Sequence, residues 1–82
     1  MTQTIIVADD HPLFRAALKQ AVSQAVPDAK TVEVDSIKAL QAAVESHPDA
    51  DLVLLDLNMP GAHGFSGLVF MRGQYPGLPV VV

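Results

Sequence analysis

The sequence predicts one α/β domain built on a parallel β-sheet. Short apolar runs alternate with segments whose apolar residues recur at a helical period, in the order strand, helix, strand, helix, strand, helix, strand. This alternation is typical of parallel strands joined by right-handed helical crossovers. Two of the runs, residues 5–8 and 52–55, are apolar throughout, which indicates strands that are covered on both faces of the sheet.

The first strand is predicted over Thr4–Ala8, and a helix follows it. Asp10 is the expected N-cap of this helix, and Pro12 lies near its first position, where the missing N–H leaves no hydrogen bond unmade. The helix is expected to end before Pro27. Its apolar stripe predicts the face that packs against the sheet and consists of Phe14, Ala17, Leu18, Ala21, Val22 and Ala25.

The second strand and second helix have simpler patterns. Residues 31–35 alternate apolar and polar side chains, as a half-exposed edge strand does. Ser36 is the expected N-cap of the short helix that follows. The stripe of this helix consists of Ile37, Leu40, Ala43 and Val44.

The remaining elements lie in the second half of the chain. Strand 52–56 is followed by a turn-rich loop and by a helix predicted over 65–74. Gly67 and Gly73 each lower the helix propensity of that segment by ~1 kcal/mol relative to alanine. Residues 80–82 are expected to begin a fourth strand.

Composition limits the kind of protein. The chain has 82 residues, of which 50% are hydrophobic and 17% charged, and this is unusually apolar for a small domain. Its net charge is −4 and its Lys and Arg residues form no cluster, so we expect no nucleic-acid binding by this segment. Cysteine is absent, the first residues do not have the pattern of a signal peptide, and no apolar run approaches the ~20 residues of a membrane span. A cytoplasmic protein without membrane contact is therefore expected.

Three aspartates follow the two fully apolar runs. Asp9 and Asp10 come directly after the first run, and Asp56 comes after the second. If the two strands are neighbours, their carboxyl ends lie side by side at the edge where open α/β sheets bind ligands. Carboxylates at such short range repel one another unless a cation neutralises them or a proton is shared. The cluster therefore predicts a site for a hard divalent cation, Mg²⁺.

Two histidines, His11 and His63, lie near this predicted site. Together with Asp56 they would supply three metal ligands, but their spacing fits no standard zinc pattern. Pro12 and Gly64 follow them directly and place both on loops or helix starts. We therefore interpret both as surface histidines.

Residues 7–15 (VADDHPLFR) and 54–61 (LLDLNMPG) together resemble the CheY-like receiver domains of two-component response regulators. The resemblance extends along the whole chain and implies a flavodoxin-like, doubly wound parallel sheet. The first segment is most similar to the NarL/FixJ/LuxR-type subclass, in which a helix-turn-helix DNA-binding domain follows the receiver.

The resemblance also implies a role for each site residue. Asp56 matches the aspartate that accepts the phosphoryl group. Asp10 matches the direct Mg²⁺ ligand, and Asp9 matches the neighbour that acts through a bound water. Asn58 matches the residue whose backbone carbonyl binds the metal. The implied partner is a sensor histidine kinase, and DNA would be bound by the C-terminal domain of the parent protein.

An enzyme is the first alternative to this signalling module. A Mg²⁺-dependent phosphohydrolase with an aspartyl nucleophile would use similar residues. Haloacid-dehalogenase-like enzymes carry an Asp-x-Asp motif on their first strand, whereas the first strand here ends in Asp9-Asp10 and Asp56 opens Asp-Leu-Asn. The motif therefore disfavours an enzyme.

The pattern departs from a complete receiver, which has five strands and five helices in roughly 120 residues. Residues 1–82 match about four strands and three helices, so we expect a C-terminally truncated receiver without an output domain. Receivers of this family carry a Ser or Thr at the end of their fourth strand and a lysine after their fifth, and both positions would lie beyond Val82. Lys19, Lys30 and Lys38 lie in other elements and cannot replace that lysine. A second alternative is therefore a signalling-incompetent module that only oligomerises. Uncovered apolar surface and the edge at 80–82 predict a dimer.

Overall fold

The computed structural model describes residues 3–56, 59 and 66–82. These residues form four strands and three helices in the alternating order predicted from the sequence. The predicted strand ends differ from the observed ones by at most one residue. The strands are β1 (Thr4–Ala8), β2 (Lys30–Val34), β3 (Leu52–Leu55) and β4 (Val80–Val81), and the helices are α1 (Pro12–Ala25), α2 (Ile37–Ser46) and α3 (Ser66–Gln74).

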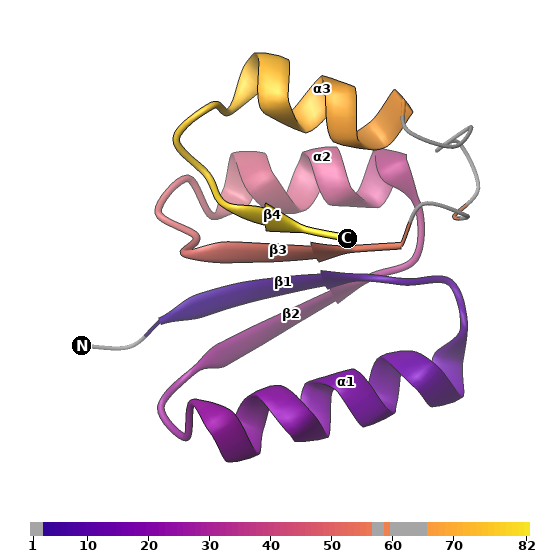
Figure 1. The fold of residues 1–82 in the computed structure, drawn as a ribbon, viewed down its shortest axis with the longest axis vertical. Helices are drawn as coiled ribbons and strands as arrows, with labels where there is room; N and C mark the ends of the chain where they lie inside the picture. The colour runs from indigo at the N-terminus through magenta and orange to yellow at the C-terminus, as the bar shows by residue number, and fades with distance from the viewer. Residues whose placement is uncertain (1–2, 57–58, 60–65) are drawn as a thin grey trace.

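The strands form one parallel sheet in the order β2-β1-β3-β4 (Figure 1). β1 lies between β2 and β3, and its Ile6 stands opposite Val32 on one side and Val53 on the other. This order is that of flavodoxin-like doubly wound sheets. The fold class expected from the sequence is confirmed, and the predicted edge position of β2 is confirmed with it.

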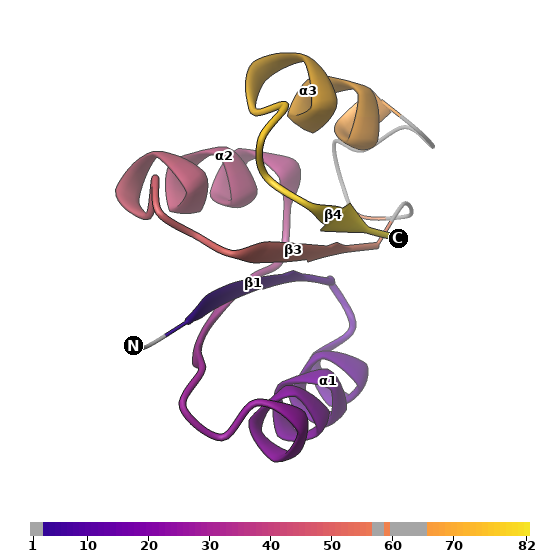
Figure 2. The ribbon, with the colours of Figure 1, turned by 60° about the vertical axis from the view of Figure 1, so that its left-hand side comes forward.

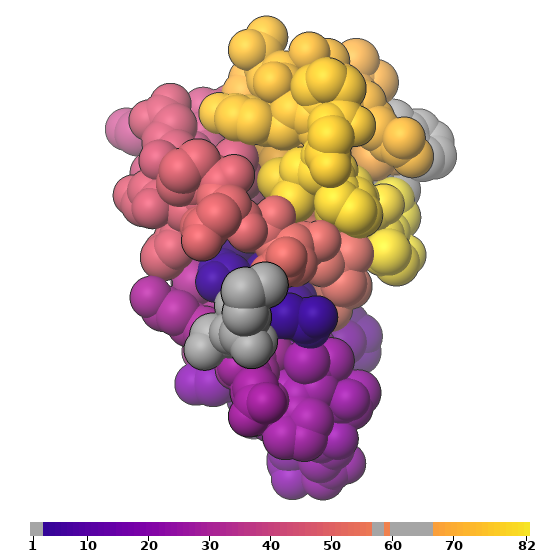
Figure 3. All heavy atoms as spheres, turned by 90° about the vertical axis from the view of Figure 1, so that its left-hand side faces the viewer, coloured from indigo at the N-terminus to yellow at the C-terminus, as the bar shows by residue number. Residues whose placement is uncertain are grey.

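Helices cover the two faces of the sheet unequally. Among the described elements, α1 alone lies on one face, and α2 and α3 lie together on the other (Figure 2). In the space-filling view, α1 forms the narrow end of the molecule, whereas α2, α3 and the segment leading to β4 form a broad layer (Figure 3). Within the described residues, no helix is long and apolar enough to cross a membrane.

The main core lies between the sheet and α2 and α3. Alternate residues of β1, β2 and β3 point into it, because successive side chains of a strand face opposite sides of the sheet. The predicted stripe of α2 is buried against them in full. Ser36 caps α2 as predicted, since its Oγ accepts the N–H of Ala39 at 3.1 Å. The core consists of Ile6, Ala8, Val34, Ile37, Leu40, Ala43, Val44, Val53, Leu55, Met59 and Met71.

The apolar stripe of α1 is only partly covered by the sheet, and uncovered apolar surface is present there as expected. α1 is described in full and contains no buried residue; Leu18 and Val22 are half-buried, and Phe14 is 58% exposed. The reason is the position of α1, because this helix lies mainly against β1 and β2. One side of its apolar stripe therefore faces an open part of the sheet.

The predicted start of α1 also needs correction. Its N-cap is His11 rather than Asp10, although Pro12 is the first helical residue as expected. The side chain of His11 makes no capping hydrogen bond. Instead, the Oδ1 of Asp9 accepts the backbone N–H of His11 at 2.7 Å. Asp9, which directly follows β1, thus stabilises the turn into α1 by this hydrogen bond.

Candidate functional site

The paired ends of β1 and β3 bring the predicted acids together. Ala8 stands opposite Leu55 in the sheet, and the N–H of Asp56 donates to the carbonyl of Ala8 at 2.9 Å. On the other side of β1, the N–H of Asp9 donates to the carbonyl of Val34 at 3.0 Å. These ladder bonds fix the backbone of both acids at one edge of the sheet.

The three carboxylates occupy different depths at this edge. The side chain of Asp9 is almost fully buried, with 4% of its surface exposed, whereas Asp10 and Asp56 are half-buried. One ligand atom from each of Asp9, Asp10, His11 and Asp56 lies within 4.8 Å of the others. The acids Asp9, Asp10 and Asp56 thus converge as predicted. The fourth predicted ligand, Asn58, and also His63, lie outside the described residues.

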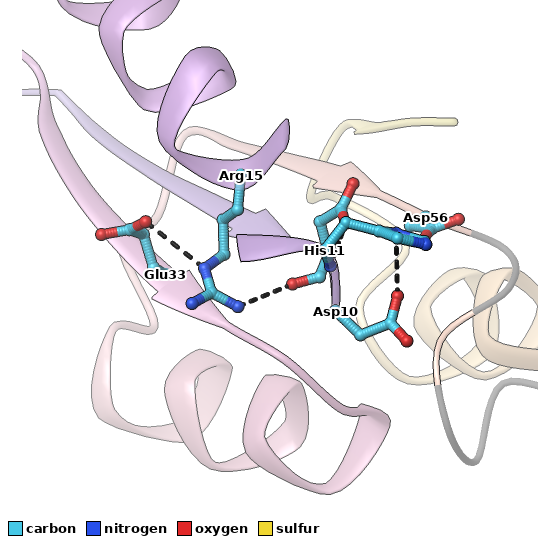
Figure 4. A network of polar contacts seen from close by, with 6 residues as sticks. Asp10, His11, Arg15, Glu33 and Asp56 are labelled. Atoms are coloured by element: carbon cyan, nitrogen blue, oxygen red, sulfur yellow. Dashed lines mark hydrogen bonds and ion pairs between the residues drawn. The ribbon is translucent and has the colours of Figure 1, made fainter. Parts of the chain in front are cut away.

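His11 lies at the surface as predicted, but its ring also contacts the three acids, which the sequence analysis did not foresee. Its side chain is 66% exposed, as a surface histidine would be, but its Nδ1 faces the acids (Figure 4). Nδ1 lies 3.1 Å from Oδ1 of Asp9, 3.1 Å from Oδ1 of Asp10 and 3.7 Å from Oδ2 of Asp56. The signal that could have found it is its position directly after the acid pair and before a helix-starting proline.

These contacts change the protonation of the histidine. The hydrogen bond to Asp9 raises the pKa of His11 above its ordinary value of 6.5, and the negative charge of Asp10 raises it further. A protonated ring supplies one positive charge among three carboxylates. The imidazolium therefore offsets part of their mutual repulsion.

A divalent cation fits the donor set. The Oδ1 of Asp10 is buried, and no described residue gives it a hydrogen bond of good geometry, although Nδ1 of His11 lies 3.1 Å away. A buried carboxylate oxygen without a hydrogen-bond donor destabilises the folded state unless a cation binds it. Carboxylate oxygens from Asp9, Asp10 and Asp56 are the hard ligands that Mg²⁺ prefers. The predicted metal chemistry is thus compatible with the arrangement of these atoms.

A second polar group ties α1 to the sheet beside the acids. Nη1 of Arg15 donates to the carbonyl oxygen of Asp9 at 2.9 Å, and its Nε lies 3.4 Å from Oε1 of Glu33 on β2 (Figure 4). Lys19 adds a second cation, with its Nζ 3.6 Å from Oε2 of Glu33. The sequence analysis missed this link. Strand alternation could have found it, because Glu33 must face away from the side of Val32 and Val34.

An apolar groove of about 580 Å³ opens next to the acids. Its walls are Phe14 and Leu18 of α1, Leu54 of β3, and Val81 and Val82 at the end of β4. Asp9, His11 and Asp56 also line it, so the groove and the acid cluster are continuous. This is the uncovered part of the sheet face that α1 leaves open.

The family comparison agrees with this architecture. The model of the response regulator receiver domain matches residues 5–82. The chain belongs to the response regulator receiver domain family. The recognition made from the two sequence segments is confirmed.

Relatives of this receiver include an activator and a response regulator. The glycerol metabolism activator of Pseudomonas putida is 42% identical over 78 residues, which are 95% of this chain and 35% of that protein. The nitrate/nitrite response regulator protein NarL of Escherichia coli K12 is 42% identical over 69 residues, which are 84% of this chain and 32% of that protein. The chain therefore spans about a third of the length of these curated relatives.

Solved structures show the same fold. The RcsB response regulator of Salmonella typhimurium matches with a TM-score of 0.85 at 26% identity, over 98% of this chain and 42% of that one. An RcsB–DNA complex matches with a TM-score of 0.83 at 26% identity, over 100% of this chain and 42% of that one. Both confirm the receiver fold for the described elements.

Proposed function

We propose that this receiver accepts a phosphoryl group on Asp56 from a sensor histidine kinase. The observation that carries the proposal is the convergence of Asp9, Asp10 and Asp56 at the carboxyl edge of the sheet. Asp56 directly follows β3, is half-buried and lines the apolar groove. A phosphoryl group can reach it from solvent, while Asp9 is buried too deeply to act as the nucleophile.

The transfer is a displacement at phosphorus. A carboxylate oxygen of Asp56 forms a P–O bond as the P–N bond to the kinase imidazole breaks. The electron pair of that bond returns to the imidazole nitrogen, which then takes a proton from solvent. The product is an acyl phosphate on Asp56 and a neutral kinase histidine.

Mg²⁺ is the proposed cofactor of this transfer. Asp9, Asp10, Asp56 and the backbone carbonyl of Asn58 would hold it, with Asp10 as a direct ligand and Asp9 acting through water. When bound, Mg²⁺ neutralises charge on the transferring group. The buried Oδ1 of Asp10 and the hard donor set support this assignment.

This chain would act as a signalling module rather than an enzyme. The receiver family is one of signalling domains, and the comparisons favour neither a phosphohydrolase nor a module that only oligomerises. Because relatives of this chain are named as activators and response regulators, we place the receiver in a cytoplasmic transcription regulator. DNA would be bound by a helix-turn-helix domain, not by this acidic segment.

Self-association of the 82-residue chain is part of the proposal. The apolar groove, together with the half-exposed side chains of Phe14, Val81 and Val82, leaves a continuous apolar surface in water. β4 pairs only with β3 among the described strands, so its outer edge can pair with another chain. A dimer covers both features at once.

The phosphotransfer is tested with acetyl phosphate and Mg²⁺, followed by intact-mass measurement. One phosphoryl group is expected on the wild-type chain and none on Asp56→Asn. Asp49→Asn serves as the matched control, because Asp49 is exposed and lies in the connection between α2 and β3. Equal labelling of the wild type and Asp56→Asn would contradict Asp56 as the acceptor.

A further inference from the structure

We propose that Arg15 is a positioning residue of the acid site: its hydrogen bond to the carbonyl of Asp9 orients the peptide between Asp9 and Asp10 and so strengthens the binding of Mg²⁺. This role rests on the metal site proposed above. Arg15 itself is a cation, so it is not a ligand of a metal, and its charge alone would repel one.

The helix directs the side chain of Arg15 towards the acids. The N–H of Arg15 donates to the carbonyl of His11 at 2.8 Å and closes the first turn of α1. Side chains of a helix point back towards its N-terminus, and α1 begins directly after the acid pair. The guanidinium therefore reaches past the start of the helix, where Nη1 donates to the carbonyl oxygen of Asp9 at 2.9 Å (Figure 4).

The same guanidinium is held by β2. Its Nε lies 3.4 Å from Oε1 of Glu33, and the side chain of Arg15 is only 22% exposed. A guanidinium is a planar fork whose nitrogens point in fixed directions relative to one another. Because Glu33 holds Nε, the fork presents Nη1 to the carbonyl of Asp9 in a set direction.

This bond completes the fixation of the backbone at Asp9. The N–H of Asp9 donates to the carbonyl of Val34 at 3.0 Å, and its Oδ1 accepts the N–H of His11 at 2.7 Å. Its carbonyl is the remaining polar group of its main chain, and Arg15 binds it. That carbonyl lies in the plane of the peptide that joins Asp9 to Asp10. Its direction therefore sets the point from which the side chain of Asp10, with its buried Oδ1, leaves the backbone.

Orientation and charge act on Mg²⁺ in opposite directions. Mg²⁺ demands near-ideal octahedral geometry, so a misdirected carboxylate lowers its affinity. Groups that orient the ligands of a metal typically contribute about 10–100-fold to its affinity. A positive charge beside the site lowers the affinity for a cation, and removing that charge raises it. The sign of the change in affinity thus separates the two effects.

The test is a titration of the 82-residue chain with MgCl₂, followed through its amide resonances in ¹H–¹⁵N NMR spectra, which also show whether each variant is folded. Arg15→Gln should weaken Mg²⁺ binding about tenfold. Lys19→Gln is the matched control, because Lys19 carries the same charge, lies one turn later on α1 and contacts the same carboxylate of Glu33 at 3.6 Å. It should leave the affinity within about twofold of wild type or raise it.

Arg15→Lys tests direction at constant charge. An ammonium group is a point charge without a planar fork, so it serves the carbonyl of Asp9 and the carboxylate of Glu33 less well together. Its affinity for Mg²⁺ should lie between those of wild type and Arg15→Gln. Wild-type affinity in Arg15→Lys overturns the role, since the directed guanidinium would then be dispensable. This variant also decides the question if Arg15→Gln does not fold.

Two further outcomes contradict the positioning role. Mg²⁺ binding by Arg15→Gln that equals or exceeds that of wild type overturns it and leaves Arg15 as an ion-pair partner of Glu33. Equal weakening by Arg15→Gln and Lys19→Gln also overturns it, because a general loosening of α1 on β2 would then explain both.

Failure of this role is distinguishable from failure of the proposed function. Asp10→Ala should abolish Mg²⁺ binding if the acid site exists. If Asp10→Ala acts as expected and Arg15→Gln does not, only the role of Arg15 is wrong. If Asp10→Ala leaves Mg²⁺ binding unchanged, the metal site of the proposed function is wrong, and the role of Arg15 falls with it.

Discussion

The two faces of the sheet differ in how completely they are covered. On the face of α2 and α3, the stripe of α2 is buried in full, and Leu40 has 0% of its surface exposed. On the face of α1, no residue of that helix is buried, and Phe14 is 58% exposed. Both stripes are amphipathic in sequence. A periodic stripe therefore predicts which side of a helix faces the sheet, but not whether neighbouring elements close over it.

The largest expected effect contrasts one residue from each face. Leu40→Ala should lower the free energy of unfolding by ~2–5 kcal/mol, because it leaves a cavity in the closed core. Phe14→Ala should lower it by less than ~1 kcal/mol, because most of that side chain already contacts water. Urea denaturation of both variants measures the difference. Similar losses would mean that the face of α1 is as well packed as the other.

The next prediction concerns association through the open face. Val81→Asp should weaken dimer formation at least about tenfold, because it introduces a charge into the apolar groove at the outer strand. Val69→Asp is the matched control, since Val69 is an even more exposed valine, lies on α3 and does not line the groove. Sedimentation equilibrium measures the dissociation constants. Wild-type chain that remains monomeric at micromolar concentration would remove the basis for the dimer.

The two glycines of α3 test how tightly the closed face is packed. Gly73→Ala should raise the free energy of unfolding by up to ~1 kcal/mol, because nothing lies within 4 Å of the added Cβ and alanine has the higher helix propensity. At Gly67, the added Cβ would lie 2.7 Å from Cδ1 of Ile37. Gly67→Ala should therefore gain less or lose stability. Equal gains in thermal or urea unfolding would mean that Ile37 moves aside freely.

The smallest expected effect is the pH dependence contributed by His11. Its pKa is raised in the folded chain by Asp9 first and then by Asp10, so protonation favours the folded state. This contribution is complete below the ordinary value of 6.5 and is lost as the pH rises through the raised pKa of the folded state. The stability difference between wild type and His11→Gln should shrink over that range. A difference that grows with pH would contradict the sign.

The positions of the acids follow from sequence alone, since local pattern sets where a strand ends. Continuous apolar runs end at Asp9 and Asp56, and parallel strands must place their carboxyl ends at one edge. The cap at Ser36 is likewise local, because one side chain satisfies an amide three residues away. These features need no knowledge of distant neighbours.

Other features depend on segments far apart in the chain. Arg15 contacts Glu33 because α1 lies against β2. His11 contacts all three acids because α1 starts at the end of β1 and β3 pairs with β1. The exposure of Phe14 also depends on tertiary structure, because no other described helix lies beside α1 on its face of the sheet. Periodicity determines the direction of a side chain, whereas burial and electrostatic contact depend on what the folded chain brings opposite to it.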